Sequence, residues 1–283
     1  MFKFNRKYRI ALTAPSRMCT KETVAAGKAV LEESGCEVTL MPHLFSGGSL
    51  SHLSACDTDR AADINAAIAD KNIDIIWAVR GGCGALRILD KINWQKLKES
   101  GKFFAGFSDI TAIHWAMAKY GINRYLAAPM MNFLAKTDDR LTVTTLNDAL
   151  CAKELQLSLP ALNPGEVTAV PLAGNMAVAA AMCGTSFFPD TSGKLLILEE
   201  IGEAPYRIER SLTQLRLAGT FDHCAGVVFG NFTDCGENSG VMAVLQDFAA
   251  RAKCPVFYGL PHGHELPFTS LSGIQKLSIT VRR

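Results

Sequence analysis

Short apolar segments alternate with longer amphipathic ones through the first half of the chain. Residues 10–14, 73–79 and 103–107 are apolar runs of the kind expected in the buried strands of a parallel sheet. Between them, apolar residues in 21–34 and 58–70 recur at helical spacing. Because alternating strands and helices are typical of βαβ units, the pattern predicts an N-terminal α/β domain built on a parallel sheet.

The second half mixes strands and helices in a less regular order. The segment 159–166 contains two prolines and a glycine, which resist both helix and central strand, so we expect a linker there. This divides the chain into an N-terminal domain, 1–158, and a smaller, strand-rich C-terminal α/β domain, 167–283. In the second domain we expect strands at 167–172, 195–198, 227–229, 256–258 and 277–281, with helices at 176–182 and 207–217.

Composition indicates an ordinary folded protein. Of 283 residues, 48% are hydrophobic and 20% are charged, which argues against disorder. The 29 basic and 27 acidic residues form no long run of one sign, so we expect no binding to nucleic acid or to a membrane surface. No segment approaches the roughly 20 apolar residues that span a bilayer.

The cysteines indicate a reducing compartment. There are nine, scattered and without a C-x-x-C pair, which favours reduced thiols. The basic start at 1–8 is followed by an apolar run too short for the core of a signal peptide. We therefore expect a cytoplasmic protein.

Ser108 is the first candidate functional residue. It follows the apolar segment 103–107 and precedes a predicted helix at 110–119. At such a turn, free backbone N–H groups and the helix dipole stabilise a negative oxygen. The alternative is that Ser108 or Asp109 only caps the helix.

A second strand-to-helix turn contains three glycines, in Arg80-Gly81-Gly82-Cys83-Gly84. Glycine lets the backbone approach a ligand closely, so this turn could donate an N–H to an oxyanion or hold a phosphate. It lacks the Lys-Ser/Thr ending of a P-loop and does not match G-x-G-x-x-G, which argues against a nucleotide site. Glycines in a tight turn can also be purely structural. If the preceding strands are neighbours, both turns face one crevice.

An acidic pair and a histidine pair complete the candidate chemistry. Glu199 and Glu200 end a buried strand, and His262 and His264 lie in the Pro/Gly-rich loop 259–265. A serine, an acid and a histidine are the set that acyl-transfer enzymes use to activate a hydroxyl. The His-x-His-Glu sequence also suits zinc, although the sequence nominates no further ligand. The residues alone lead as far as a candidate serine hydrolase.

Several motifs, in one order from residue 10 to about 273, together match a known family. They are Ala14-Pro15-Ser16, residues 78–84 with Arg87, Gly106-Phe107-Ser108-Asp109-Ile110-Thr111-Ala112, Gly174-Asn175-Met176, Gly184-Thr185, residues 198–210 and Gly263-His264. In this combination the chain resembles the LD-carboxypeptidase family, the muramoyltetrapeptide carboxypeptidases.

The resemblance implies a catalytic role for five residues. Ser108 would be the nucleophile, His264 the general base, and Glu199 the acid that orients and stabilises the imidazole. Backbone N–H groups of Gly82 and Asp109 would form the oxyanion hole. No metal and no organic cofactor is implied.

The implied reaction cleaves the amide bond between the L-centre of a diamino acid and the terminal D-alanine of murein tetrapeptides, in peptidoglycan recycling. The groove for this muropeptide would lie between the two domains, usually in a homodimer. A related branch inactivates a peptide-nucleotide antibiotic, and a catalytically silent peptide-binding protein is a further alternative. The segment 201–207 looks more like the cell-wall branch.

A substrate that ends in a carboxylate needs a cationic subsite, for which Arg80 and Arg207 are candidates. Each could instead be a structural ion-pair partner. Glu203 could meet an amino group of the substrate or pair with Arg207.

Three positions depart from the family pattern. Cys83 stands where tyrosine is common, and Arg17 and Ala173 stand where glycine is usual. By analogy Cys83 would lie in the groove and shift side-chain preference.

Overall fold

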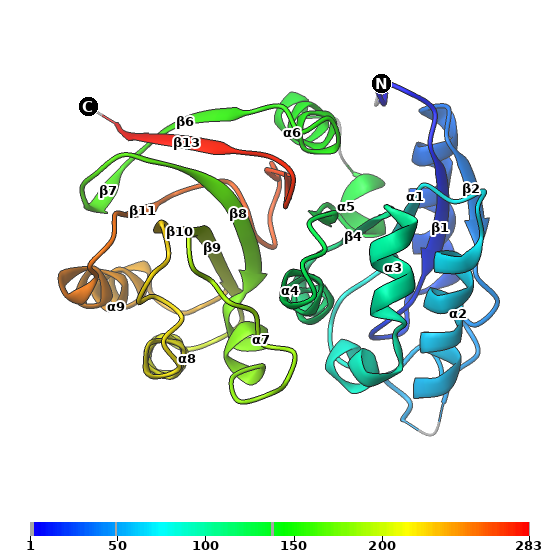
Figure 1. Cartoon of the computed structure of the whole chain (residues 1–283), viewed down its shortest axis with the longest axis horizontal. Coiled ribbons are helices and arrows are strands. Elements are labelled where there is room, and N and C mark those ends of the chain that lie inside the picture. The colour runs from blue at the N-terminus through cyan, green and yellow to red at the C-terminus, as the bar shows by residue number, and fades with distance from the viewer. Residues whose placement is uncertain (1–2, 49, 137–138, 283) are drawn as a thin grey trace.

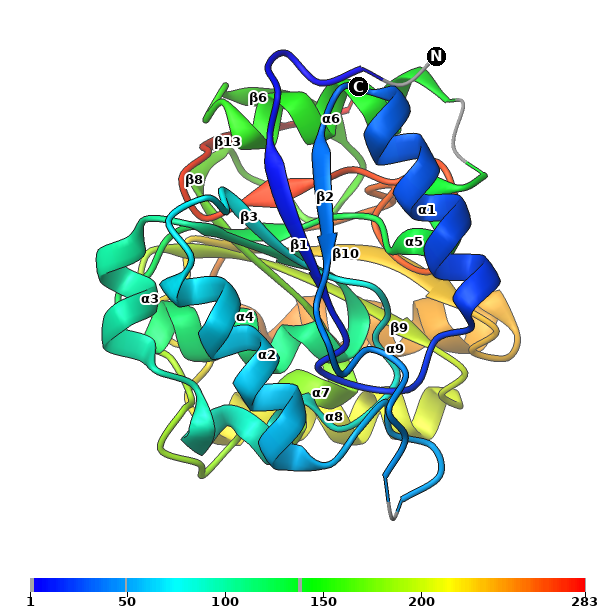
Figure 2. The same ribbon diagram turned by 90° about the vertical axis from the view of Figure 1, so that its right-hand side faces the viewer.

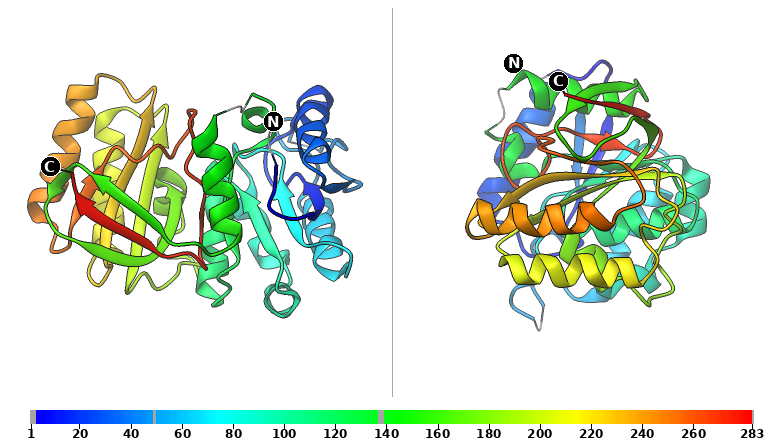
Figure 3. Two further views of the ribbon diagram at one scale, coloured as in Figure 1. Left: turned by 90° about the horizontal axis from the view of Figure 1, so that it is seen from above. Right: turned by 90° about the vertical axis from the view of Figure 1, so that its left-hand side faces the viewer.

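The computed structural model of the chain describes residues 3–48, 50–136 and 139–282. Two mostly parallel sheets stand beside each other, with helices between them and around them (Figure 1). Seen from above, the first half of the chain forms one of these units and the second half the other (Figure 3). Residues 1–2, which begin the basic start and the predicted N-terminal domain, and residue 283 lie outside the described residues.

The first sheet has the strand order β12-β5-β4-β3-β1-β2. Its neighbouring strands are parallel except for β12, which comes from the second half and pairs antiparallel with β5. The predicted strands at 10–14, 73–79 and 103–107 are confirmed as β1, β3 and β4. The strands are β1 (Arg9–Thr13), β2 (Glu37–Leu40), β3 (Ile75–Ala78), β4 (Phe103–Gly106), β5 (Tyr125–Ala127) and β12 (Leu271–Ser272).

Helices cover both faces of this sheet because successive strand side chains alternate between two buried layers. Ile10 and Trp77 pack on one face, with α1 (Lys21–Glu33), α5 (Met131–Leu134) and α6 (Arg140–Leu150). Ala11 and Ile76 pack on the other. That second face is covered by α2 (Asp57–Ala69), α3 (Trp94–Ser100), α4 (Thr111–Lys119) and the 3₁₀ helix η1 (Ala85–Lys91), and a short 3₁₀ turn, η2 (Ser108–Ile110), precedes α4.

The second sheet has the order β6-β13-β8-β9-β10-β11-β7. The central strands β8 to β11 are parallel, and α8 and α9 run side by side along one face (Figure 3). The strands are β6 (Leu155–Leu159), β7 (Ala161–Asn163), β8 (Val167–Asn175), β9 (Lys194–Ile201), β10 (Gly226–Thr233), β11 (Val256–Tyr258) and β13 (Leu277–Val281), and the helices are α7 (Met176–Ala181), α8 (Pro205–Leu217) and α9 (Asn238–Arg251).

Residues 159–166 differ from the linker that the sequence predicts, because they contain the end of β6 and all of β7. β7 pairs antiparallel with β11, and the Asn163 side chain donates hydrogen bonds to two backbone carbonyls, of Ala252 and Cys254. β6 and β7 lie at the two edges of the sheet, where neighbouring prolines are tolerated. The second sheet therefore begins at Leu155, before the predicted boundary.

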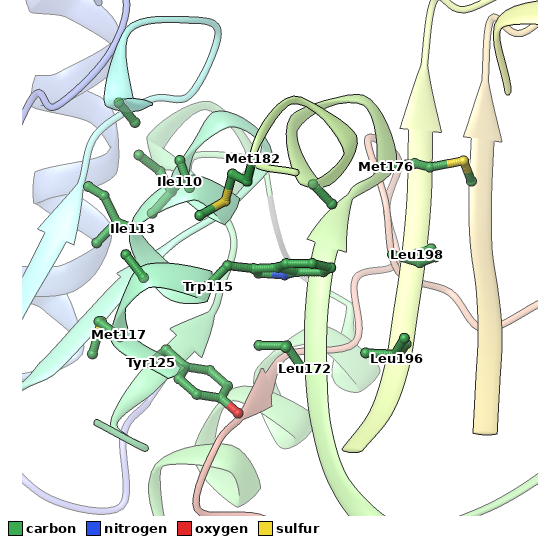
Figure 4. Packing of buried hydrophobic residues seen from close by; sticks show 14 of the residues in the cluster. Ile110, Ile113, Trp115, Met117, Tyr125, Leu172, Met176, Met182, Leu196 and Leu198 are labelled. Carbon is green, nitrogen blue, oxygen red and sulfur yellow. The ribbon is translucent and has the colours of Figure 1, made fainter. Parts of the chain in front are cut away.

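The two sheets share one hydrophobic core across α4. Trp115 of α4 is fully buried, lies beside Leu172 (Figure 4), and donates its indole N–H to the carbonyl of Ala173 in β8 at 3.2 Å. The Tyr125 hydroxyl donates to the carbonyl of Pro171 at 3.0 Å. Because these contacts are buried, they hold the two halves of the chain in a fixed relation to each other. Within the described ranges, no helix has the length and apolar character needed to cross a membrane.

Candidate active site

The turns that follow β3 and β4 lie against each other, as the sequence predicts for neighbouring strands. β3 and β4 are paired in parallel, so their carboxyl ends meet at one edge of the sheet. A Cβ atom on Gly81 would lie 2.8 Å from the Cβ of Ser108 and 3.1 Å from the backbone nitrogen of Asp109. Only glycine therefore fits at position 81, and its absent side chain lets the serine turn approach the glycine turn.

Ser108 occupies a strained backbone conformation at the start of η2. Its φ is 65°, in the left-handed region that costs a residue with a Cβ roughly 1–2 kcal/mol. The side chain is partly exposed and lines a cavity at the edge of the first sheet. Strain of this kind at a partly exposed serine is typical of a functional turn.

His264 connects Ser108 to Glu199 through two hydrogen bonds. Its Nε2 lies 3.1 Å from the Ser108 hydroxyl, and its Nδ1 lies 2.9 Å from Glu199 Oε2. Glu199 stands at the carboxyl end of β9, and His264 comes from the loop after β11. The fold thus brings together three side chains that are far apart in the sequence.

The hydrogen-bond chain runs from a fully buried acid to a partly exposed serine. The Glu199 side chain is 0% exposed and that of His264 is 11% exposed, with the Phe107 ring 4.7 Å from the imidazole. An ionised carboxylate only accepts, so Nδ1 donates to Glu199 and Nε2 is left to accept the Ser108 proton. The arrangement can therefore increase the nucleophilicity of the serine oxygen.

Glu200, the second acid of the pair, points away from His264 because consecutive strand residues face opposite sides of a sheet. Its Oε1 accepts a hydrogen bond from the Asn175 side chain at 2.6 Å, and its Oε2 accepts one from the backbone N–H of Ala177 at 2.8 Å. Burial raises the pKa of the Glu200 carboxyl. This acid therefore anchors the start of α7.

His262 also has a structural environment. Its ring is fully buried between Phe107 and Phe268, and its Nδ1 lies 2.8 Å from the carbonyl oxygen of Thr269. The rings of His262 and His264 both contact Phe107 but have different hydrogen-bond partners. In the part of the chain that the structure describes, no group of three His, Cys, Asp or Glu side chains is arranged to hold a metal ion.

The stability of the protein should depend on pH through His262. Burial lowers the pKa of His262 from 6.5 to about 4, so between these values the unfolded chain binds a proton that the folded chain does not. The free energy of unfolding then falls as pH falls through this window, by up to about 1.4 kcal/mol per pH unit. Urea unfolding at about pH 7.5 and pH 5 should show a drop larger by about 2 kcal/mol in the wild type than in His262→Gln. Equal drops would contradict this assignment.

Two buried charged side chains hold the turns of the site together. The Asp109 carboxylate accepts hydrogen bonds from the Ser16 hydroxyl at 2.7 Å and from the backbone N–H of Ala85 at 2.8 Å. Arg60 of α2, 2% exposed, donates to the carbonyl of Pro15 and, at 3.0 Å, to that of Gly84. The turns after β1, β3 and β4 are therefore connected to one another by buried hydrogen bonds.

Replacing Arg60 by methionine should lower kcat by about 10-fold to 100-fold while KM changes little, because the glycine turn loses its buried anchor. Leaving the buried carbonyl of Pro15 without this donor should also lower the free energy of unfolding by about 1–3 kcal/mol, whereas the carbonyl of Gly84 still accepts the backbone N–H of Arg87. Partial recovery of kcat with millimolar guanidinium would separate positioning from simple loss of folded protein. Arg87→Met is the matched control, since Arg87 is exposed and pairs with the same residue, Asp57. An unchanged kcat in folded Arg60→Met would contradict the positioning role.

The cavity has a volume of about 610 Å³ and is bounded by both halves of the chain. The first half contributes Arg80, Gly82, Met130, Asn132 and Phe133 among others, and the second half contributes Ile201 and His264. Sequence reasoning did not single out Met130, Asn132 or Phe133. The available signal was a further apolar strand, β5, that ends at the same edge of the sheet.

The other sequence candidates lie in different places. Gly82 lines the cavity with a φ of 111°, and the backbone N–H of Asp109 directly follows Ser108. Glu203 and Arg207 are outside the cavity lining and pair with each other at 3.3 Å. Cys83 is exposed and, contrary to the analogy, does not line the cavity.

Comparison with known proteins connects this geometry to one family. The LD-carboxypeptidase N-terminal domain matches residues 10–127, and the LD-carboxypeptidase C-terminal domain matches residues 168–275. A murein tetrapeptide carboxypeptidase of Pseudomonas aeruginosa is 26% identical over 90% of this chain and 88% of its own.

Solved structures give the same fold. A muramoyltetrapeptide carboxypeptidase from Oxalobacter formigenes superposes with a TM-score of 0.85 at 27% identity, covering 97% of this chain and 95% of that one. The microcin C7 self immunity protein also reaches 0.85, at 18% identity over 99% and 96% of the two chains, which shows a shared fold alone. Both halves of the family model and the two-sheet architecture agree, so the chain belongs to the LD-carboxypeptidase family.

Proposed function

We propose that this protein is a serine peptidase that releases the terminal D-alanine from murein tetrapeptides in peptidoglycan recycling. The observation that carries the proposal is the chain of hydrogen bonds from Ser108 through His264 to Glu199 at the edge of a cavity. The substrate class is supported by the names of relatives at 26% and 27% identity.

In the acylation step, the Ser108 hydroxyl oxygen attacks the carbonyl carbon of the L,D amide bond while His264 Nε2 takes its proton. Glu199 stabilises the imidazolium that forms, because its fully buried carboxylate lies 2.9 Å from Nδ1. Backbone N–H groups of Gly82 and Asp109 stabilise the oxyanion. The C–N bond then breaks, the imidazolium proton passes to the leaving amine, and D-alanine departs.

In the deacylation step, a water molecule attacks the ester carbon of the acylated Ser108. His264 now accepts a proton from that water and returns one to the serine oxygen as the ester bond breaks. The tripeptide leaves with a new carboxylate. The proposed mechanism balances without a metal or an organic cofactor.

The terminal carboxylate of the substrate requires a cation close to the scissile bond, and Arg80 supplies one in the cavity lining. Its head group donates to the carbonyl of Met18 at 3.3 Å and has no carboxylate partner within the described residues. The cytoplasmic location and the homodimer expected from the sequence belong to the same proposal, and the unpaired state of all nine cysteines supports a reducing compartment.

The proposal is tested with a panel of substrates that differ at the C-terminal end of the peptide. A muramoyl tetrapeptide ending in D-alanine should be cleaved. The same peptide ending in L-alanine, and a pentapeptide ending in D-alanyl-D-alanine, should remain uncleaved. Products are identified by mass spectrometry. Cleavage of a peptidyl nucleotide in place of the tetrapeptide would overturn the proposal in favour of the antibiotic-inactivating activity.

A further inference from the structure

A second cavity adjoins the one that contains Ser108. It has a volume of about 420 Å³ and shares Arg17, Cys19, Thr20 and Arg80 with the first, so the two form one continuous groove. Its lining includes residues 17–21, which connect the carboxyl end of β1 to the start of α1, at the edge of the sheet where β2 also ends (Figure 2). A group bound there would be joined to the scissile bond by a short stretch of substrate.

The second cavity is rich in positive charge. Arg17, Lys21 and Arg80 line it, whereas no Asp or Glu among the described residues lines either cavity. None of these three cations takes part in an ion pair within the described chain. Lys21 lies 5.9 Å from the centre of the Phe45 ring, and Glu22, the acid in the first turn of α1, is exposed and outside the lining.

Local charge of this kind is informative because the chain as a whole is nearly neutral, at +2. Three cations gathered without a carboxylate repel one another, and an anion removes that cost. The positive end of the α1 dipole acts in the same direction, although it would not define a site alone. The groove therefore favours a substrate with a second negative group beyond its terminal carboxylate.

We infer that Arg17 and Lys21 form a subsite for a second carboxylate of the peptide stem, beside Arg80, which is proposed to meet the terminal carboxylate. This inference rests on the proposed function, because it places that carboxylate on a murein peptide. The free α-carboxylate of a γ-linked glutamate is such a group, and its amidation removes the charge while leaving shape almost unchanged. The enzyme then discriminates free from amidated peptide stems.

The test measures binding to Ser108→Ala protein by calorimetry, so that it does not depend on turnover. The probes are two tetrapeptides that differ only in a free or amidated α-carboxylate. We expect the free acid to bind about fivefold to tenfold more tightly, with the difference shrinking as salt is raised. Adding Lys21→Gln or Arg17→Gln should weaken binding of the free acid and leave that of the amide unchanged.

Lys28→Gln is the matched control, since Lys28 is on the same helix and pairs with Glu32 at 2.5 Å, away from the groove. It should preserve the preference for the free acid. Arg17 and Lys21 are exposed and Lys28 is partly exposed, so these substitutions should leave the fold intact.

Equal affinity for the acid and the amide, or an equal loss for both in Lys21→Gln, would overturn the subsite. A dependence on Lys21 seen only with a nucleotide-linked peptide would overturn it too, because the anion would then be a phosphate. Hydrolysis by the wild type is scored separately, so failure of the proposed function and failure of the subsite give different results.

Discussion

Replacing Ser108 by alanine should lower kcat by up to about 10⁶-fold. The substitution removes the hydroxyl oxygen that lies 3.1 Å from His264 Nε2, and with it the acyl-enzyme route. Alanine keeps the Cβ, so the strained backbone of the turn and the approach of Gly81 are unaffected. The loss should therefore appear in kcat, measured as D-alanine release, with the free energy of unfolding nearly unchanged.

His264→Ala should cause a loss of similar size, and the double variant should be little worse than either single one, because the residues act as a unit. Ser239→Ala is the matched control, since Ser239 is an exposed serine in the first turn of α9. A loss of less than tenfold in Ser108→Ala would refute the role of Ser108.

Replacing Glu199 by glutamine should lower kcat by about 10⁴-fold. The amide no longer stabilises the imidazolium, and it can present a donor to Nδ1 and so favour the wrong tautomer. Because the Glu199 side chain is fully buried, water cannot substitute for the missing charge. The pH dependence of kcat/KM in wild type and variant separates this effect from a loss of folded protein.

Glu200→Gln is the matched control for Glu199→Gln. The change is chemically identical one residue away, yet it affects hydrogen bonds to Asn175 and Ala177 at the start of α7. We expect the free energy of unfolding to fall by about 1–3 kcal/mol and kcat to fall by less than tenfold. If Glu200→Gln lost as much kcat as Glu199→Gln, the distinct roles of the two acids would be contradicted.

The parts of the fold that the sequence predicts well are those with a strong local signal. Buried strands such as β3 and β9 are short apolar runs, and α1 and α2 have clear amphipathic spacing. β7 is not predicted, because prolines close to an edge strand give the same sequence pattern as a linker. β12 is not predicted either, because it is two residues long and its pairing with β5 depends on a contact distant in sequence.

The candidate site follows the same division. Ser108, Glu199 and His264 can be nominated from strand ends and a Pro/Gly-rich loop, and from family motifs. Strand alternation, which orients Glu199 toward His264 and Glu200 away, is visible only once the register of β9 is known.

The residue that supports the turns of the site could not be identified from the sequence. Arg60 looks like an ordinary exposed helix residue until its contacts with Pro15 and Gly84 are seen. The contacts of Arg60 arise from tertiary packing, which has no local sequence signature. The pairing of Glu203 with Arg207 is instead a local i,i+4 contact, and the sequence offers it as one of two alternatives.

The most direct test of the account is incubation of purified wild-type protein and of Ser108→Ala with a muramoyl tetrapeptide ending in D-alanine, followed by mass spectrometry. The account predicts tripeptide and free D-alanine from the wild type in equal amounts, and neither product from the variant over the same time. Intact tetrapeptide in both reactions, or equal release in both, would contradict it.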